Sequence, residues 1–351
     1  MEEQSRTYIL EASDLSVSFE TDAGEVQAVR NVSLSLKKGE VLAIVGESGC
    51  GKSVLCKSLM KMLPGNARIK SGKILANGID ITKYKERDMA KLRGTLFSMV
   101  FQDPMTALNP TMTIGKQIEE AIKIHNPHIK RDALEKRVIE LMELVGIDQA
   151  EERMKLYPYH FSGGMRQRSV LAIALAGNPS ILIADEPTTA LDVTIQAQIL
   201  DLMRSLKDKI NSSIMLITHD LGVIAEMADY VVVMYAGRVV EKGTAQEIFK
   251  TPSHPYTIGL MRSKPVVGKQ VDRLYSIPGK VPNPINMPDY CYFKDRCELS
   301  CDKCNGSYPG VVKLSPTHEV SCYRYQDRKE AGWLMEEHLG KEGASERESE
   351  A

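Results

Sequence analysis

The sequence lacks an excess of charge of either sign, a long hydrophobic run and a secretion signal. Its 351 residues contain 45 Lys and Arg against 46 Asp and Glu, so no basic surface for a nucleic-acid partner is indicated. The apolar runs at 41–46 and 169–177 are far shorter than the ~20 residues that cross a bilayer, so any membrane role must come through a partner. The first ten residues, MEEQSRTYIL, have neither the basic flank nor the apolar stretch of an exported chain, and we expect no export.

Cysteine is scarce outside the last part of the chain. Only Cys50 and Cys56 precede a tail cluster of five: Cys291, Cys297, Cys301, Cys304 and Cys322. In a chain that is not exported, such a cluster favours metal binding over a disulfide framework. The length exceeds that of one compact core, which predicts a main domain with an appendage.

Apolar periodicity predicts an α/β fold. Residues 8–45 alternate as strands, and VLAIV at 41–45 is continuously apolar, as in a strand buried on both faces. A helix is predicted from about 52 to 63, and buried strands return at 181–185, 214–218 and 230–235. Strands alternating with helical segments predict a mostly parallel sheet.

Domain boundaries follow from changes in composition. We expect a main domain over residues 1–250, including a helical subdomain at about 104–178 whose apolar spacing is helical from 113 to 145. A small irregular extension rich in proline and cysteine follows over 251–332. The glutamate-rich stretch at 333–351 is expected to be disordered.

The stretch GESGCGKS (46–53) predicts a phosphate site, because it matches G-x-x-x-x-G-K-[ST] between a strand and a helix. Its glycines let successive backbone N–H groups point inward toward an anion. Lys52 supplies a cation for the phosphates, and Ser53 supplies a hydroxyl for Mg²⁺. The predicted nucleotide contacts are Gly46, Glu47, Ser48, Gly49, Cys50, Gly51, Lys52, Ser53 and Val54, with no redox role for Cys50.

An acidic pair follows the buried strand ILIAD. Asp185 and Glu186 are placed at the end of the sheet where such folds bind ligands. Carboxylates emerging from an apolar strand are costly unless they meet a metal or a reacting group. We therefore assign Asp185 to Mg²⁺ and Glu186 to the positioning of an attacking water.

Between these motifs lies FSGGMRQR (161–168), and here the chain resembles the ATPase subunits of ABC transporters, whose signature is usually written LSGGQ. Phe161 and Met165 depart from that pattern, whereas Ser162, Gly163 and Gly164 retain it. The resemblance implies a P-loop ABC ATPase core with an antiparallel β subdomain. It also implies a head-to-tail dimer in which residues 162–165 face ATP bound by the other subunit.

Other residues take roles from the same resemblance. Phe19 resembles the aromatic that stacks on adenine, with a core strand residue as the alternative. Gln102 resembles the glutamine that touches Mg²⁺ and senses the membrane partner, and Asp192 resembles the residue that communicates across the dimer. His219 resembles the histidine that contacts the γ-phosphate. The implied catalytic set is Glu186, His219 and Lys52.

HPYTIGLM (254–261) and IPGKVPNP (277–284) narrow the resemblance to the peptide, dipeptide and nickel import ATPases. In that family, four tail cysteines match Cys291, Cys297, Cys304 and Cys322, which implies a [4Fe–4S] cluster. From the residues alone, zinc is equally admissible, and Cys301 forms a C-x-x-C with Cys304 that suits zinc. His318 is a further possible ligand, with a plain surface histidine as its alternative.

The resulting hypothesis is the ATP-hydrolysing subunit of a peptide importer at the cytoplasmic face of the membrane. Its implied partners are a second, non-identical ATPase chain, two permeases and a solute-binding protein, with no nucleic acid. Alternatives are import of nickel or another small solute, a soluble ABC ATPase acting on ribosomes or DNA, and a metal-binding regulator in which ATP is only structural.

Overall fold

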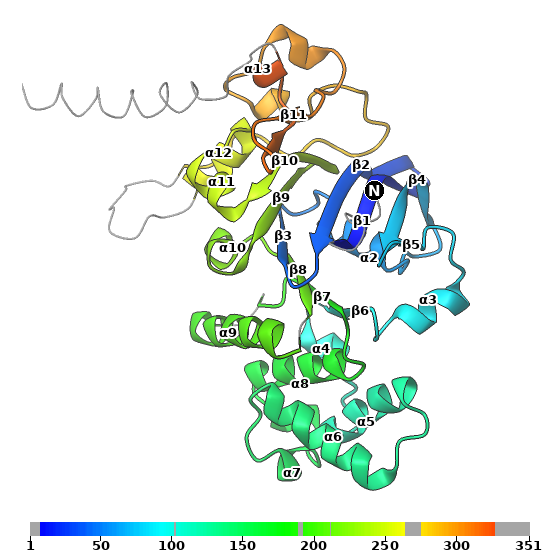
Figure 1. Ribbon diagram of the computed structural model, residues 1–351. Coiled ribbons are helices and arrows are strands. Elements are labelled where there is room, and N and C mark those ends of the chain that lie inside the picture. The colour runs from blue at the N-terminus through cyan, green and yellow to red at the C-terminus, as the bar shows by residue number, and fades with distance from the viewer. Residues whose placement is uncertain (1–7, 102, 189–191, 211, 264–274, 327–351) are drawn as a thin grey trace, which may run out of the picture.

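The computed structural model describes residues 8–101, 103–188, 192–210, 212–263 and 275–326. Two sheets occupy its middle, with a helical region below them and the C-terminal extension above them in Figure 1. The larger sheet has the strand order β11-β12-β10-β9-β3-β8-β7-β6, and the smaller has the order β2-β1-β4-β5. The predicted tail at 333–351 lies outside the described residues.

The parallel part of the larger sheet is its buried centre. Its strands are β9 (Tyr230–Tyr235), β3 (Val41–Val45), β8 (Ser213–Ile217), β7 (Ile181–Asp185) and β6 (Phe97–Val100). Every residue of β3, β6, β7 and β8 is buried. Burial on both faces explains why these strands read as continuous apolar runs, and it confirms the α/β prediction.

The smaller sheet is antiparallel and consists of β1 (Tyr8–Thr21), β2 (Gly24–Lys37), β4 (Ala67–Ala76) and β5 (Ile79–Asp80). Helix α2 (Lys52–Leu59) contributes Leu55 to the core that this sheet shares with β3. The helix ends earlier than the predicted residue 63. Lys61 adopts a left-handed φ of 54°, and the Met62 N–H bonds back to the Lys57 carbonyl, which closes the helix.

The helical region comprises α4 (Pro104–Ala107), α5 (Ile114–His125), α6 (Arg131–Leu144), α7 (Ala150–Arg153), the 3₁₀ turn η1 (Pro158–His160) and α8 (Gly163–Leu175). Ile118, Leu141 and Leu171 lie in its core. The helical stretch predicted over 113–145 is two helices, because Pro127 lacks the N–H that a continuous helix would require.

Two further helices flank the sheet, α9 (Val193–Ile210) and α10 (Leu221–Met227), and the short α3 (Glu86–Leu92) follows β5. Among the described residues, no helix combines the length and the apolar character needed to span a bilayer.

The C-terminal extension is more regular than predicted. After α11 (Ala245–Lys250), it contains α12 (Pro255–Arg262), the 3₁₀ turns η2 (Lys294–Arg296) and η3 (Asp302–Asn305), β11 (Val312–Lys313), β12 (Glu319–Val320) and α13 (Tyr323–Gln326). β12 pairs with β10 (Arg238–Thr244), so the extension adds two strands to the main sheet.

Candidate functional site: a nucleotide cleft at the end of the parallel sheet

The predicted phosphate loop connects β3 to α2. Two of its glycines are required by space: a Cβ on Gly46 would lie 2.2 Å from the Met234 carbonyl oxygen, and a Cβ on Gly51 would lie 2.2 Å from that of Ala28. Gly51 also has a φ of 97°, which other residues rarely adopt. The chain therefore curls tightly before α2 begins at Lys52, which leaves the first N–H groups of the helix at the loop.

The Lys52 ammonium is directed back along the loop. Its Nζ donates to the carbonyl oxygens of Gly46 at 2.6 Å and Glu47 at 3.0 Å. The residue is only 6% exposed. A buried cation with fixed donors is suited to binding the outer phosphates of a nucleotide.

Ser53 and Asp185 meet, as the Mg²⁺ prediction requires. The Ser53 hydroxyl donates to Asp185 Oδ1 at 2.9 Å. Burial raises the pKa of Asp185, while the bond from Ser53 and nearby lysines oppose that rise. A hydroxyl and a carboxylate at this distance offer the oxygen ligands that Mg²⁺ prefers, so the residues fit the ion. The third predicted ligand, Gln102, lies outside the described residues.

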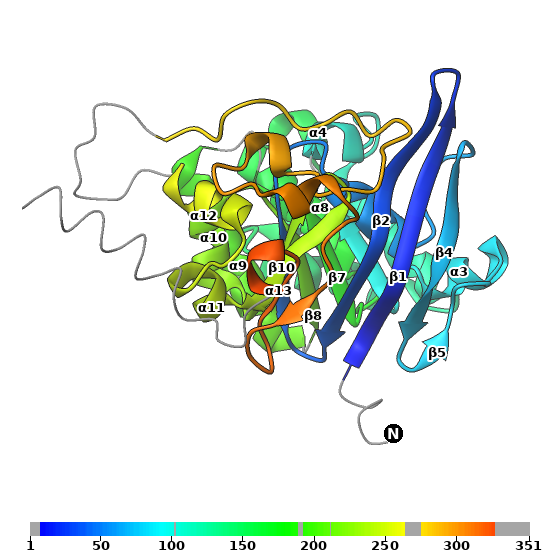
Figure 2. The ribbon, with the colours of Figure 1, turned by 90° about the horizontal axis from the view of Figure 1, so that it is seen from above.

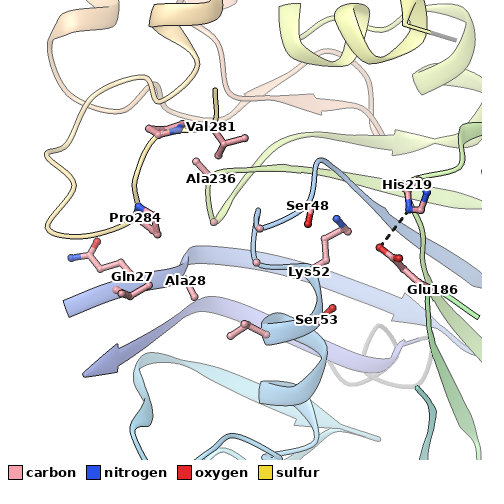
Figure 3. A pocket seen from close by; sticks show the side chains of 16 residues that line it. Gln27, Ala28, Ser48, Lys52, Ser53, Glu186, His219, Ala236, Val281 and Pro284 are labelled. Carbon is pink, nitrogen blue, oxygen red and sulfur yellow. Dashed lines mark ion pairs between the residues drawn. The ribbon is translucent and has the colours of Figure 1, made fainter. Parts of the chain in front are cut away.

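Glu186 and His219 also come together, although 33 positions separate them. Glu186 follows β7 and His219 follows β8, and these strands are parallel neighbours. The Glu186 carboxylate lies 3.5 Å from His219 Nδ1 (Figure 3). Glu186 has a left-handed φ of 48°, and its N–H donates to the Ile217 carbonyl. This backbone turn directs the carboxylate into the cleft rather than along the strand.

A cleft of about 630 Å³ joins the phosphate loop to the Glu186–His219 pair. Figure 3 shows Lys52 and Ser53 between that pair and the tip of β2, where Gln27 and Ala28 form another wall. Phe19 does not line this cleft in the described part of the chain. It lies opposite Val26, a lining residue, in the β1–β2 pair, so its role as the adenine aromatic stays a prediction.

The C-terminal extension supplies a wall of this cleft that the sequence did not lead us to expect. The segment 281–286, here called the strap, contributes Val281, Pro282 and Pro284 to the lining. The chain reaches this segment from the side of α12, where Tyr275 and Ile277 lie close to Gly259, and runs to the tip of β2 (Figure 2). The Gln27 N–H donates to the Pro284 carbonyl at 3.2 Å, and Val26 forms a β-bridge with Ile285. In the sequence, IPGKVPNP (277–284) indicated only a resemblance to the peptide and nickel import ATPases. A proline-rich run does not indicate which surface of the protein it packs against.

The signature residues lie away from the cleft, at the start of α8 in the helical region (Figure 1). Ser162 caps that helix by accepting a bond from the Met165 N–H, and Ser162 and Gly163 are exposed. Gly164 is buried against Ile195. Asp192, also exposed, accepts a bond from the Ile195 N–H. One chain therefore does not bring residues 162–165 to its own phosphate loop.

The tail cysteines gather in the extension without forming a ready ligand set. Among the described residues, no three His, Cys, Asp or Glu side chains are arranged to hold a metal ion. Burial, with a smaller contribution from neighbouring thiols, raises the pKa of Cys291 and of Cys322 to about 12. Cys301, which is exposed, places its sulfur 3.6 Å from that of Cys304.

The prediction for His318 was wrong in both of its forms. It is neither a cysteine-site ligand nor a surface histidine, because it is 3% exposed and its Nε2 lies 2.7 Å from Glu241 Oε1. Glu241 also accepts bonds from the N–H groups of Ser253 and His254. This carboxylate joins β10, the start of α12 and the segment before β12, so His318 has a structural role.

Comparison with known proteins agrees with this geometry. Residues 29–189 match the ABC transporter family, and residues 240–304 match the C-terminal region of oligopeptide/dipeptide transporters. The chain is 53% identical to the dipeptide transport ATP-binding protein DppD of Lactococcus lactis subsp. cremoris, over 88% of this chain and 89% of that protein. It is 51% identical to the oligopeptide transport ATP-binding protein OppD of Bacillus subtilis, over 90% and 89%.

Solved structures show the same fold. CbiO1 of Clostridium perfringens, part of the ABC transporter complex cbiONQ, has a TM-score of 0.60 at 27% identity, covering 70% of this chain and 92% of that one. A dimeric ATP-binding cassette bound to ADP and phosphate has a TM-score of 0.60 at 24% identity, covering 67% and 98%.

Proposed function

The chain belongs to the ATP-binding subunits of ABC transporters, which are ATPases, and we propose that its ATP hydrolysis drives the import of di- or oligopeptides. The two peptide-transport relatives and the match of residues 240–304 support the peptide substrate class. The observation that carries the enzymatic part is the single cleft in which the phosphate loop and the Glu186–His219 pair meet.

In the proposed reaction, the N–H groups of the loop and the Lys52 ammonium bind the phosphates. Glu186 orients the attacking water and accepts its proton, and His219 contacts the γ-phosphate from the neighbouring strand end. Mg²⁺, held by Ser53 and Asp185 together with Gln102, would neutralise charge on the phosphate oxygens. Phe19, opposite the lining residue Val26, would stack on adenine.

The active assembly is proposed to be a head-to-tail dimer. Ser162 and Gly163 are exposed at the start of α8, and phosphoryl transfer needs hydrogen-bond donors on both sides of the transferred group. Residues 162–165 of one subunit would complete the cleft of the other, with Asp192 at the junction. A second, non-identical ATPase chain is the proposed partner.

Attachment to the membrane is proposed to run through two permeases served by a solute-binding protein. The helical region carries large apolar side chains on its surface, among them Ile124 at 67% exposed and Tyr159 at 64%. Phe101, next to Gln102, is 38% exposed. Apolar groups in contact with water suit the docking of permease helices at the cytoplasmic face of the membrane.

We also propose that Cys291, Cys297, Cys304 and Cys322 hold a [4Fe–4S] cluster, with zinc as the alternative ion. This proposal is supported by the thiol of Cys304, which contributes to the raised pKa of Cys291, Cys297 and Cys322. Sulfur ligands suit either choice. A bound metal would replace the protons of the thiols and draw their side chains together, which would stabilise a lobe with little regular structure.

The test is recovery of the tagged chain from detergent-solubilised native membranes, followed by mass spectrometry and metal analysis. Two permeases and a second ATPase in the same sample would support the importer, and a co-purified binding protein would indicate the solute. Recovery of ribosomes, nucleic acid or no membrane protein would overturn the transport proposal while leaving the ATPase chemistry in place.

A further inference from the structure

Glu47, the second residue of the phosphate loop, is held by two residues of the C-terminal extension. Arg296 Nη1 lies 2.8 Å from Glu47 Oε2. The Glu47 N–H donates to the Tyr256 hydroxyl, also at 2.8 Å. Sequence separations of 249 and 209 residues mean that only the folded extension brings these groups to the loop.

Arg296 is itself fixed on several sides. Its Nε donates to the Pro278 carbonyl at 2.7 Å, and its guanidinium also bonds the Tyr235 hydroxyl. Its side chain is 6% exposed. Burial lowers the pKa of Arg296, but the bonds to Glu47 and Tyr235 outweigh that effect and leave the pKa raised. A buried guanidinium is rigid and strongly dependent on its carboxylate partner.

Tyr256 is equally constrained. It is fully buried in α12, and its ring packs against those of Tyr235 and Phe293, with centroid separations of 4.7 and 5.4 Å. Phe293 precedes η2, the turn that carries Arg296. Both residues that contact Glu47 therefore pack on one aromatic cluster, because the Arg296 guanidinium also lies over the Tyr235 ring.

Glu47 connects this cluster to the phosphate-binding cation. Its carbonyl oxygen accepts one of the two loop bonds made by Lys52 Nζ. A change in the position of Glu47 therefore moves an acceptor of the lysine that is proposed to bind the phosphates.

We propose that Arg296 is a positioning residue for the phosphate loop, which acts through Glu47 so that the C-terminal extension sets the affinity of the loop for ATP. This inference rests on the proposed role of the loop. Because coupling between two sites is reciprocal, ATP binding must in turn stabilise the extension around η2.

The test compares the full chain with Arg296→Met and with the conservative Arg296→Lys. Lys294→Met is the matched control, because Lys294 lies in the same turn but bonds Asn305 and stacks over Tyr290, both within the extension. Affinity for a fluorescent ATP analogue and the KM and kcat for hydrolysis are measured. We expect Arg296→Met to weaken ATP binding by about tenfold and Arg296→Lys to restore part of the loss. Lys294→Met should change binding by less than about twofold.

Two further measurements separate positioning from general destabilisation. In Glu47→Gln combined with Arg296→Met, the loss of affinity should be no larger than in the worse single variant, because both act through one contact. In hydrogen–deuterium exchange, Mg²⁺ with a non-hydrolysable ATP analogue should protect residues 290–304 in the wild type but not in Arg296→Met.

Unchanged ATP affinity in Arg296→Met, with or without a lower melting temperature, would overturn the inference. If that variant does not fold, Glu47→Gln decides, because it removes the carboxylate charge that Arg296 binds; wild-type affinity in it would also overturn the inference. Failure of the wild type to bind ATP would instead contradict the proposed function of the loop.

Discussion

The carboxylate of Glu186 lies 3.5 Å from Nδ1 of His219, at the ends of two parallel strands that are neighbours in the sheet. The contact brings together the residues that follow β7 and β8, on one side of the phosphate loop. It places a potential base and a potential phosphate contact on rigid elements, which favours a hydrolytic role over a merely structural use of ATP.

Glu186→Gln should abolish ATP turnover and leave ATP binding intact. The amide keeps the size and hydrogen bonds of the side chain but cannot accept the proton of the attacking water, so kcat should fall by at least about 100-fold. Phosphate release and binding of an ATP analogue measure the two effects. Glu226→Gln, a surface change in α10, is the control. Equal turnover in Glu186→Gln and wild type would contradict the assignment.

Asp185→Asn should raise the Mg²⁺ concentration needed for half-maximal hydrolysis by about tenfold or more. The substitution removes the negative charge beside Ser53 while preserving the shape of the side chain. A titration of activity against Mg²⁺ at saturating ATP measures the shift, with Asp201→Asn, at an exposed position of α9, as control. A Mg²⁺ dependence equal to that of the wild type would exclude Asp185 from the ion's surroundings.

His254 should make the protein less stable as the pH falls below about 6.5. Burial lowers its pKa to about 3, so the unfolded chain takes up a proton between these values that the folded chain does not. Stability is full above pH 6.5 and declines by up to about 1.4 kcal/mol per pH unit from this group. Its neutral ring caps α12, since Nδ1 accepts from the Tyr256 N–H.

Urea unfolding at pH 7 and pH 5 measures this effect. His254→Asn keeps a capping side chain without a titrating ring and should show a smaller loss of stability on acidification. His128→Asn, at an exposed position, should behave like the wild type. The prediction fails if wild type and His254→Asn lose the same free energy of unfolding between the two pH values.

Serine substitutions should divide the tail cysteines into two classes. Cys291→Ser and Cys322→Ser should lose the bound metal of anaerobically purified protein, whereas Cys301→Ser should retain it, because Cys301 is exposed and is not one of the four proposed ligands. Iron and labile sulfide would identify the cluster, and zinc without sulfide would favour the alternative. Wild-type protein with neither metal would reject both.

Patterns of neighbouring residues predicted those parts of the molecule that are formed by residues close together in the sequence. Continuous apolar runs located the buried strands, and GESGCGKS located a turn in which the space around Gly46 and Gly51 admits no side chain. Helix ends were less accurate: α2 stops at Leu59 because Lys61 takes up a left-handed conformation, and a lysine there gives no such signal. Pro127, in contrast, does signal a helix break in the sequence. The helical spacing of apolar residues on both sides of it nevertheless suggested one continuous helical stretch.

Contacts across long separations required the fold. Nothing in a run of prolines indicates that residues 281–284 line the nucleotide cleft, or that Arg296 reaches Glu47, because those contacts depend on how the extension packs against β2 and β9. His318 likewise gives no sign in the sequence that it is buried against Glu241, 77 residues away.

Spacing along the chain encodes the phosphate loop, the strand-end carboxylates and the fold class, since each arises from neighbours in sequence. The walls of the cleft and the link from the extension to the loop arise only from tertiary packing, which brings together groups whose separation in sequence carries no information about their distance in space.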